Sequence, residues 1–218
     1  MENRFEPSLE RRYTGRSGDL WRRIELERAR GYWEENVVLG RRRLRARLAD
    51  RLAPLEGSSI LDLGCGAGVT AAYLADRGAR VTGVDLRPCF ADWRLRPGVR
   101  FVLGDLRDVW IGSEKLSAVV LQNVLEDHPP SQWPQLLASV AERSVPRLLL
   151  VVRLANPWRR WTAVVDPAAE LPIADPVAVL RAVHLHTGYR LVHQEKVQRR
   201  NYHAQIADFR YGDDGAEV

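Results

Sequence analysis

The chain has 218 residues, 45% of them hydrophobic, so it is long enough for one α/β domain with a full core and a short N-terminal extension. Its longest apolar run is residues 148–152 and its first residues, MENRFEPSLERR, are charged, so we expect neither a membrane span nor a secretory signal and place the protein in the cytoplasm. The formal charge is +5. The two cysteines, Cys65 and Cys89, are too few for a disulfide scaffold or a metal site, so we expect neither.

Residues 1–55 are predicted to form an N-terminal arm with helices that act as a lid. Residues 1–18 have no regular pattern, whereas 19–30 and 36–52 have helical spacing. The apolar positions of the second helix share one face and are Val37, Leu44, Leu48 and Leu52. This helix should therefore pack on the domain that follows.

Residues 59–88, SILDLGCGAGVTAAYLADRGARVTGVDLRP, predict a strand, a glycine turn, a helix and a second strand. The strand at 59–63 is a short apolar run, as in a buried parallel sheet. The helix at 69–77 can place Val69, Ala72, Leu74 and Ala75 on one face. The second strand, at 79–84, ends in Asp85.

The rest of the chain continues the alternation of strands and helices. Three more strands are predicted at 99–103, 116–121 and 148–153, and a final antiparallel pair at 189–197 and 201–209. One helix spans 131–143 with Ser131 as its N-cap, and another opens at Asp175-Pro176 and ends at Gly188. We therefore predict an α/β domain at 56–212 with a seven-stranded Rossmann-like sheet, and a disordered tail at 213–218.

The glycine turn indicates a nucleoside cofactor. Glycines let the backbone approach a ligand, the helix start offers N–H groups, and an acid at the tip of the second strand can accept ribose hydroxyls. The spacing is Asp62-x-Gly64-x-Gly66-x-Gly68 rather than the G-x-G-x-x-G of dinucleotide sites. It resembles motif I of class I S-adenosylmethionine (SAM) methyltransferases. A nicotinamide or flavin site, and a glycine turn without a ligand, remain as alternatives.

The resemblance implies a set of cofactor-binding residues at four strand ends. The first end would hold the methionyl part of SAM, the second the ribose and adenine, the third the adenine amino group, and the fourth the path to the sulfonium. These residues are Asp62, Gly64, Cys65, Gly66 and Gly68, then Asp85 and Leu86, then Asp105 and Leu106, and finally Gln122. Asp62 could instead be a structural residue that stabilises the turn, and Asp105 could be an ordinary turn residue. Cys65 is expected to supply a small side chain for packing.

The flanks resemble magnesium-protoporphyrin IX O-methyltransferases from about residue 12 to 210. The N-terminal segment RRYTGRSGDLWRRI is similar to the family's Y-F-x-x-x-G-F-x-R-W-x-x-I segment, and GYRL, EKV and NYHAQ are similar to its C-terminus. The chain departs from the family after the fourth strand. There the family has D-V-L-I-H-Y-P and this chain has N-V-L-E-D-H-P, with Asp127 at the family's histidine position and His128 at its tyrosine position.

The expected reaction is an in-line methyl transfer to an oxygen of a small acidic or aromatic molecule, with a tetrapyrrole propionate as a candidate. A carboxylate acceptor is already ionised at pH 7, whereas a phenol needs a base, for which His128 is the best-placed residue. By the resemblance, Tyr13 closes the arm over the methyl group. His128 could instead be a capping residue and Tyr13 an arm-packing aromatic. Residues 154–174, with Trp158 and Trp161, are a candidate lid or a surface insert.

Other acceptors are kept open. They are a natural-product phenol or amine, RNA or a protein bound by the arginine-rich surface, and no acceptor at all in a non-catalytic SAM-binding protein. Lys115 and Lys196 are the only lysines, and a genome rich in G and C also explains the arginines. No basic stretch is interleaved with aromatics, so nucleic acid is not expected as a partner. Weak association with a membrane surface and the oligomeric state are left open.

Overall fold

The structure, a computed structural model, describes residues 42–66, 68–86, 97–108, 115–154, 175–199 and 202–212. Several predictions lie outside these residues: the arm with Tyr13, the helix at 19–30, the segment with Trp158 and Trp161, and the tail at 213–218.

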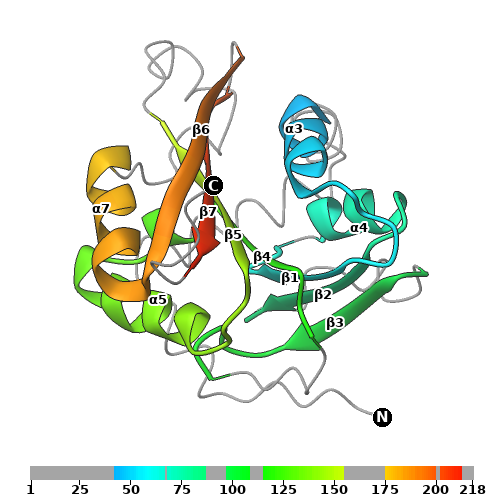
Figure 1. The fold of residues 1–218 in the computed structure, drawn as a ribbon, viewed down its shortest axis with the longest axis horizontal. Helices are drawn as coiled ribbons and strands as arrows, with labels where there is room; N and C mark the ends of the chain where they lie inside the picture. Colours follow the sequence, from blue (N-terminus) through cyan, green and yellow to red (C-terminus); the bar gives the residue numbers. More distant parts are fainter. Residues whose placement is uncertain are drawn as a thin grey trace, which may run out of the picture.

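Seven strands, the predicted number, form one sheet, and their order is β3-β2-β1-β4-β5-β7-β6 (Figure 1). Their bounds are β1 (Ser59–Leu63), β2 (Arg80–Asp85), β3 (Val99–Leu103), β4 (Ala118–Gln122), β5 (Arg147–Arg153), β6 (Tyr189–Arg199) and β7 (Tyr202–Tyr211). The first five strands are parallel, and β7 pairs antiparallel with both β5 and β6. The predicted final antiparallel pair is confirmed.

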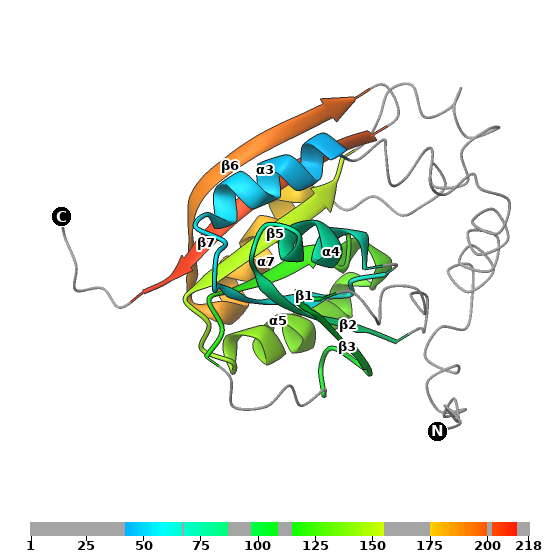
Figure 2. The same cartoon turned by 90° about the vertical axis from the view of Figure 1, so that its right-hand side faces the viewer.

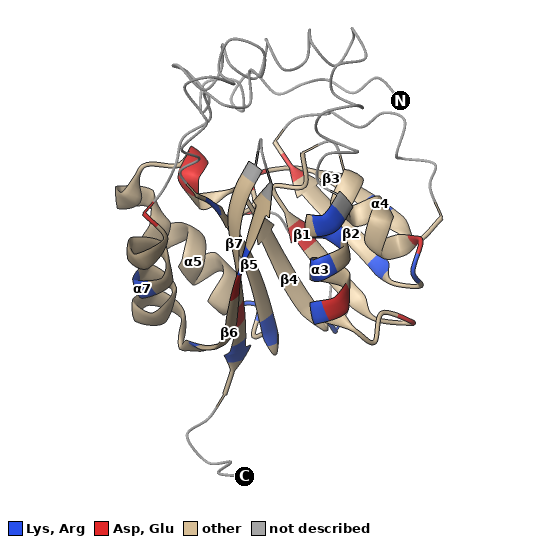
Figure 3. Cartoon of the chain, turned by 90° about the horizontal axis from the view of Figure 1, so that it is seen from above, with Lys and Arg blue, Asp and Glu red and all other residues tan. Residues whose placement is uncertain are grey.

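Helices cover both faces of the sheet (Figure 3). On one face lie α3 (Arg42–Leu52) and α4 (Val69–Ala75), and on the other lie α5 (Trp133–Ala141) and α7 (Pro176–Thr187). Two short 3₁₀ turns, η4 (Leu125–Asp127) and η5 (Pro130–Gln132), connect β4 to α5. Because both faces are covered, the central strands are buried throughout, which explains their apolar runs.

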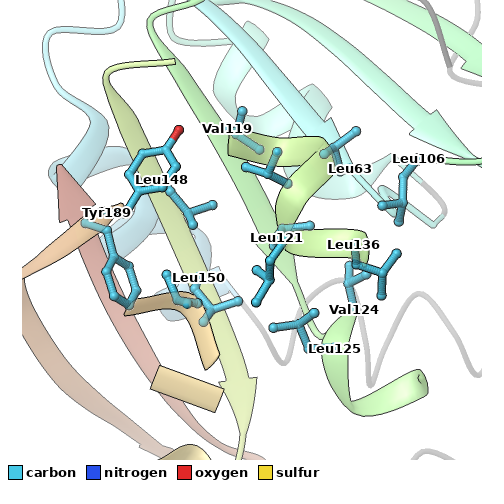
Figure 4. Packing of buried hydrophobic residues seen from close by; sticks show 14 of the residues in the cluster. Leu63, Leu106, Val119, Leu121, Val124, Leu125, Leu136, Leu148, Leu150 and Tyr189 are labelled. Atoms are coloured by element: carbon cyan, nitrogen blue, oxygen red, sulfur yellow. The ribbon is translucent and has the colours of Figure 1, made fainter. Parts of the chain in front are cut away.

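Two hydrophobic clusters form the core, one on each face. Neighbouring strand residues point to opposite faces, so Ile60 packs with Leu48 of α3 and Leu61 belongs to the other cluster. That second cluster joins Leu121 and Leu150 of the central strands to Leu136 of α5 (Figure 4).

The predicted apolar face of α3 is confirmed for its described part. Leu44, Leu48 and Leu52 are all buried, and they belong to the cluster that contains Val197 and Ile206 of the final hairpin. Figure 2 shows α3 crossing in front of β6 and β7. The helix therefore packs on the sheet, and Val37 lies outside the described residues.

The predicted caps of α7 are confirmed. The Asp175 side chain accepts a hydrogen bond from the Val177 N–H at 3.0 Å, Pro176 takes the first turn, and Gly188 ends the helix at φ 70°. In α4 the buried side is Thr70, Ala71, Ala72 and Leu74, so the helix is turned slightly from the predicted face, which included Val69 and Ala75.

The predicted N-cap of α5 is wrong. Pro130 begins the 3₁₀ turn η5, which places Ser131 inside a helical turn, and Gln132 occupies the cap without a side-chain hydrogen bond. An N-cap needs a non-helical backbone, which this turn does not leave to Ser131. The indole N–H of Trp133 instead donates to the carbonyl oxygens of Leu125 and His128.

No helix in the described part of the chain is long and apolar enough to cross a membrane.

Candidate functional site

The candidate site lies where the carboxyl ends of the parallel strands meet. The chain runs from β1 outward through β2 to β3 and then returns to β4 on the other side of β1. Such a reversal of strand order is where open α/β sheets bind ligands. The structure brings Asp62, the glycine turn, Asp85, Asp105 and Gln122 to this edge, because each lies at or just after a strand end.

The glycine turn is held against β2 by backbone hydrogen bonds. The N–H groups of Gly64 and Cys65 both donate to the Val84 carbonyl, at 2.8 and 3.0 Å. The Gly66 N–H donates to Asp85 Oδ2 at 2.8 Å, so Asp85, the predicted ribose-binding residue, also fixes the backbone of the turn. The thiol of Cys65 faces Gly83, where a Cβ would come within 2.9 Å of the sulfur, in agreement with a packing role.

Two glycines of the turn differ in their surroundings. A Cβ on Gly64 would come within 2.6 Å of Val124 Cγ2, whereas a Cβ on Gly66 would have no atom of the described residues within 4 Å. Both residues have positive φ, 71° and 54°, as has Gly68 at 68°. Gly64 is therefore required by packing, and Gly66 opens onto space in which a ligand can approach the backbone.

Asp62 is a buried carboxylate without a hydrogen bond. It is 1% exposed, and neither of its oxygens has a hydrogen-bond partner in the described part of the chain. Desolvation raises its pKa from 3.8 to about 7, the charge of Asp85 adds to the increase, and the Ala71 N–H, whose geometry falls short of a hydrogen bond, opposes it. An isolated buried carboxylate next to an open glycine turn fits the ammonium group of a methionyl ligand.

The β4 side of the site is built by the segment from Gln122 to His128. Gln122 Oε1 accepts a hydrogen bond from Thr70 Oγ1 at 2.8 Å, which links the end of β4 to the start of α4. The Asn123 N–H then donates to the Val151 carbonyl, and Asn123 adopts φ 56°. This segment therefore turns sharply at the carboxyl end of β4, beside β1.

His128 is held by its own segment. Its Nδ1 lies 2.8 Å from the Val124 carbonyl oxygen, and because a carbonyl only accepts, Nδ1 carries the proton in this contact. Nε2 of a neutral ring then has the lone pair. The side chain is half-buried, and the predicted role as a base is compatible with this orientation.

Three charged residues beside His128 did not enter the predicted site. Glu126 is buried and accepts the Arg153 N–H at 2.9 Å. Burial raises the pKa of the half-buried Asp127 to about 6, Arg153 lowers it, and Glu126 raises it. In the sequence, Glu126 and Asp127 are visible only as part of the segment E-D-H, which departs from the pattern of the related family.

Asp105, after β3, forms an ion pair with Arg107. Asp105 accepts from the backbone N–H and the Nε of Arg107, each at 2.9 Å, and pairs with its Nη2 at 2.5 Å. The side chain of Leu106 belongs to the hydrophobic core (Figure 4). Leu86 is half-buried after β2. The adenine contacts of Asp105, Leu106 and Leu86 stay predictions.

Comparisons with known proteins connect this geometry to a family. Residues 60–146 match the model of the methyltransferase domain. Over 190 residues the chain is 29% identical to the magnesium-protoporphyrin O-methyltransferase of Rhodobacter capsulatus, covering 81% of this chain and 83% of that protein. A ubiquinone biosynthesis O-methyltransferase of Paracidovorax citrulli is 54% identical, but over only 43 residues, which are 20% of this chain and 18% of that protein.

Solved structures share the fold. Magnesium protoporphyrin IX methyltransferase from Synechocystis PCC 6803 with bound S-adenosylhomocysteine (SAH) superposes with a TM-score of 0.69 and 18% identity, covering 95% of this chain and all of that chain. The 1,6-didemethyltoxoflavin-N1-methyltransferase of Burkholderia thailandensis superposes with a TM-score of 0.66 and 20% sequence identity, covering 89% of this chain and 88% of that chain.

Proposed function

We propose that this chain, a SAM-dependent methyltransferase with a Rossmann-like sheet, methylates an oxygen of a small acidic or aromatic molecule, and that its first candidate acceptor is a propionate of magnesium-protoporphyrin IX. One observation carries the proposal: the similarity to the magnesium-protoporphyrin enzyme covers 81% of this chain and so extends well beyond the matched domain at 60–146. The parts outside the cofactor motif are those that can contact an acceptor. Similarity over only 43 residues, as with the ubiquinone enzyme, says less about the acceptor.

In this proposal different residues of the described chain bind different parts of the cofactor. SAM supplies an electrophilic methyl group on a sulfonium. Asp62 would hold the ammonium group, Asp85 the ribose hydroxyls, and Gln122 would line the path between cofactor and acceptor. The isolated oxygens of Asp62 and the open face of Gly66 support this assignment.

The acceptor decides whether a base is needed. A propionate is ionised at pH 7, so the protein has only to orient it and exclude water. A phenol must lose a proton, and Nε2 of His128 is the candidate that would take it. We expect the carboxylate case, in which His128 orients its loop through the Val124 carbonyl rather than moving a proton.

The test is a methyl-transfer assay of the full chain with radiolabelled SAM. Magnesium-protoporphyrin IX, the metal-free porphyrin and a panel of phenols are each offered to the wild type and to His128→Ala. We expect the porphyrins to be methylated and the variant to keep its turnover within about tenfold, because no proton has to be removed. His186→Ala is the matched control, since His186 is exposed on α7.

Two outcomes would contradict the proposal. A loss of roughly 10²–10⁴-fold in His128→Ala, with phenols as the better acceptors, would indicate general-base catalysis on a hydroxyl. Transfer only to a nitrogen, or only to RNA, would remove the O-methyltransferase assignment and leave the SAM site intact.

A further inference from the structure

Asp127 is a half-buried carboxylate at the end of η4 that makes no hydrogen bond through its side chain in the described part of the chain. Four charged or titratable groups act on it. They are Arg153 at the end of β5, Glu126 and His128 beside it in the loop, and Asp85 at the end of β2.

The backbone places this carboxylate at the cofactor crevice. The Val124 side chain fills the space beside Gly64, so the β4 segment lies directly against the glycine turn. The Asp127 N–H donates to the Val124 carbonyl at 3.1 Å, which fixes η4 on that segment. Asp85, whose charge is felt at Asp127, is itself bonded to the Gly66 N–H. Asp127 therefore lies in η4, directly after the segment that packs against the glycine turn.

A second, independent observation points to a cationic ligand in the same place. Asp62 is 1% exposed, has no hydrogen-bond partner in the described chain, and also interacts with Asp85. Asp62 on β1 and Asp127 in η4 thus both lie within the influence of the Asp85 charge. A buried carboxylate without a hydrogen-bond partner is costly, so a ligand with positive charge would stabilise Asp62, and it would also be attracted by Asp127.

We propose that Asp127 is a specificity-determining residue that favours the positively charged sulfonium of SAM over the neutral thioether of SAH. The proposal rests on the cofactor assignment above and not on the identity of the acceptor. SAM and SAH share the adenine, the ribose, the ammonium and the carboxylate, and they differ by one methyl group and one positive charge. Asp62 and Asp85 would act on shared parts of the two molecules, so their contribution cancels when the two affinities are compared.

The position of the sulfur supports this role. In SAM the sulfur joins the ribose to the methionyl chain. A cofactor held at the ribose by Asp85 and at the ammonium by Asp62 would have its sulfur between those two groups, and the segment that leads to Asp127 packs against the same glycine turn through Val124. Product would then leave more easily, because transfer of the methyl group removes the charge that Asp127 attracts.

The experiment measures the dissociation constants of SAM and SAH by calorimetry, without acceptor, for the wild type and for Asp127→Asn. Asparagine keeps the size of the side chain and removes its charge. We expect the ratio of the SAH constant to the SAM constant to fall about tenfold in the variant at pH 8, the effect of one charge–charge interaction in a half-buried site. Asp50→Asn, an exposed position on α3, is the control with the same change in net charge.

The wild type provides a second measurement that needs no variant. Above its pKa of about 6 Asp127 is charged and prefers SAM, so the ratio should rise as the pH increases from 5 to 8, and SAM should release more protons than SAH near pH 6. A ratio that is the same in wild type and Asp127→Asn, or that is independent of pH in the wild type, would overturn the proposal. Failure of both ligands to bind the wild type would instead overturn the cofactor assignment on which it rests.

Discussion

Replacing Gly64 and Gly66 by alanine separates the packing role of the glycine turn from its binding role. Both residues have positive φ, so alanine is strained at either position. At Gly64 the new Cβ also overlaps Val124 Cγ2 at 2.6 Å, whereas at Gly66 it meets no atom of the described residues within 4 Å. Gly64→Ala should therefore lower stability, and Gly66→Ala should mainly obstruct the cofactor.

The size of the effect follows from these contacts. A non-glycine residue in the left-handed region costs about 1–2 kcal/mol, and an extra methyl in a packed site costs about 1–3 kcal/mol. The free energy of unfolding should thus fall by about 2–5 kcal/mol in Gly64→Ala and by about 1–2 kcal/mol in Gly66→Ala. For a chain of this length the first change corresponds to a Tm lower by roughly 4–20 °C.

Urea unfolding followed by the fluorescence of the seven tryptophans measures both variants. Combining Gly64→Ala with Val124→Ala removes the overlapping methyl groups, so the cost of Gly64→Ala in that background should drop to the backbone strain alone. Calorimetry with SAM should show a loss above about tenfold for Gly66→Ala. Equal destabilisation by both glycine substitutions, with no relief from Val124→Ala, would refute the reasoning.

Two further predictions concern the carboxylates of the site. In the ligand-free protein Asp62 keeps its proton up to a pKa of about 7, whereas the unfolded chain loses it near 3.8, so stability falls as the pH rises between these values. Asp62→Asn should match the wild type near pH 4 and exceed it by up to about 4 kcal/mol at pH 8, while binding SAM more weakly; urea titrations across this range test it, and a constant difference would contradict the burial argument. Asp85→Ala should weaken SAM binding by about 1–3 kcal/mol because the Gly66 N–H and the ribose lose their acceptor, and unchanged affinity in calorimetry would remove the ribose assignment.

Some wrong details of the sequence analysis have identifiable causes. Serine is a favoured residue type at an N-cap, but the two prolines before Ser131 start a 3₁₀ turn, and Gln132 is the N-cap of α5 instead. The buried side of α4 includes Thr70 because its hydroxyl donates to Gln122. Both outcomes depend on neighbours that a single helical pattern does not contain.

The elements that the sequence alone determined are those fixed by local rules. The strand bounds of β1 and β3 follow from short apolar runs, and α7 follows from Asp175, Pro176 and Gly188, whose backbone preferences act within a few residues. The spacing of Asp62 and the glycines likewise identified the cofactor turn, because that turn is built by consecutive residues. A sheet of seven strands was expected, and the structure has it, but the order of the strands was not predicted.

Tertiary structure decided the burial of the charged groups in the site and their distances from one another. Asp62 became an isolated carboxylate because β1 lies between β2 and β4, where Gly83 and Val120 pair with it and no polar side chain in the described chain reaches its oxygens. Thr70 and Gln122, 52 residues apart, meet only because the end of β4 lies beside the start of α4. Asp127 comes under the influence of Asp85 and Arg153 for the same reason: parallel strands bring their carboxyl ends to one edge whatever their separation along the chain. Burial and proximity between distant residues set the pKa values there, and neither can be derived from spacing.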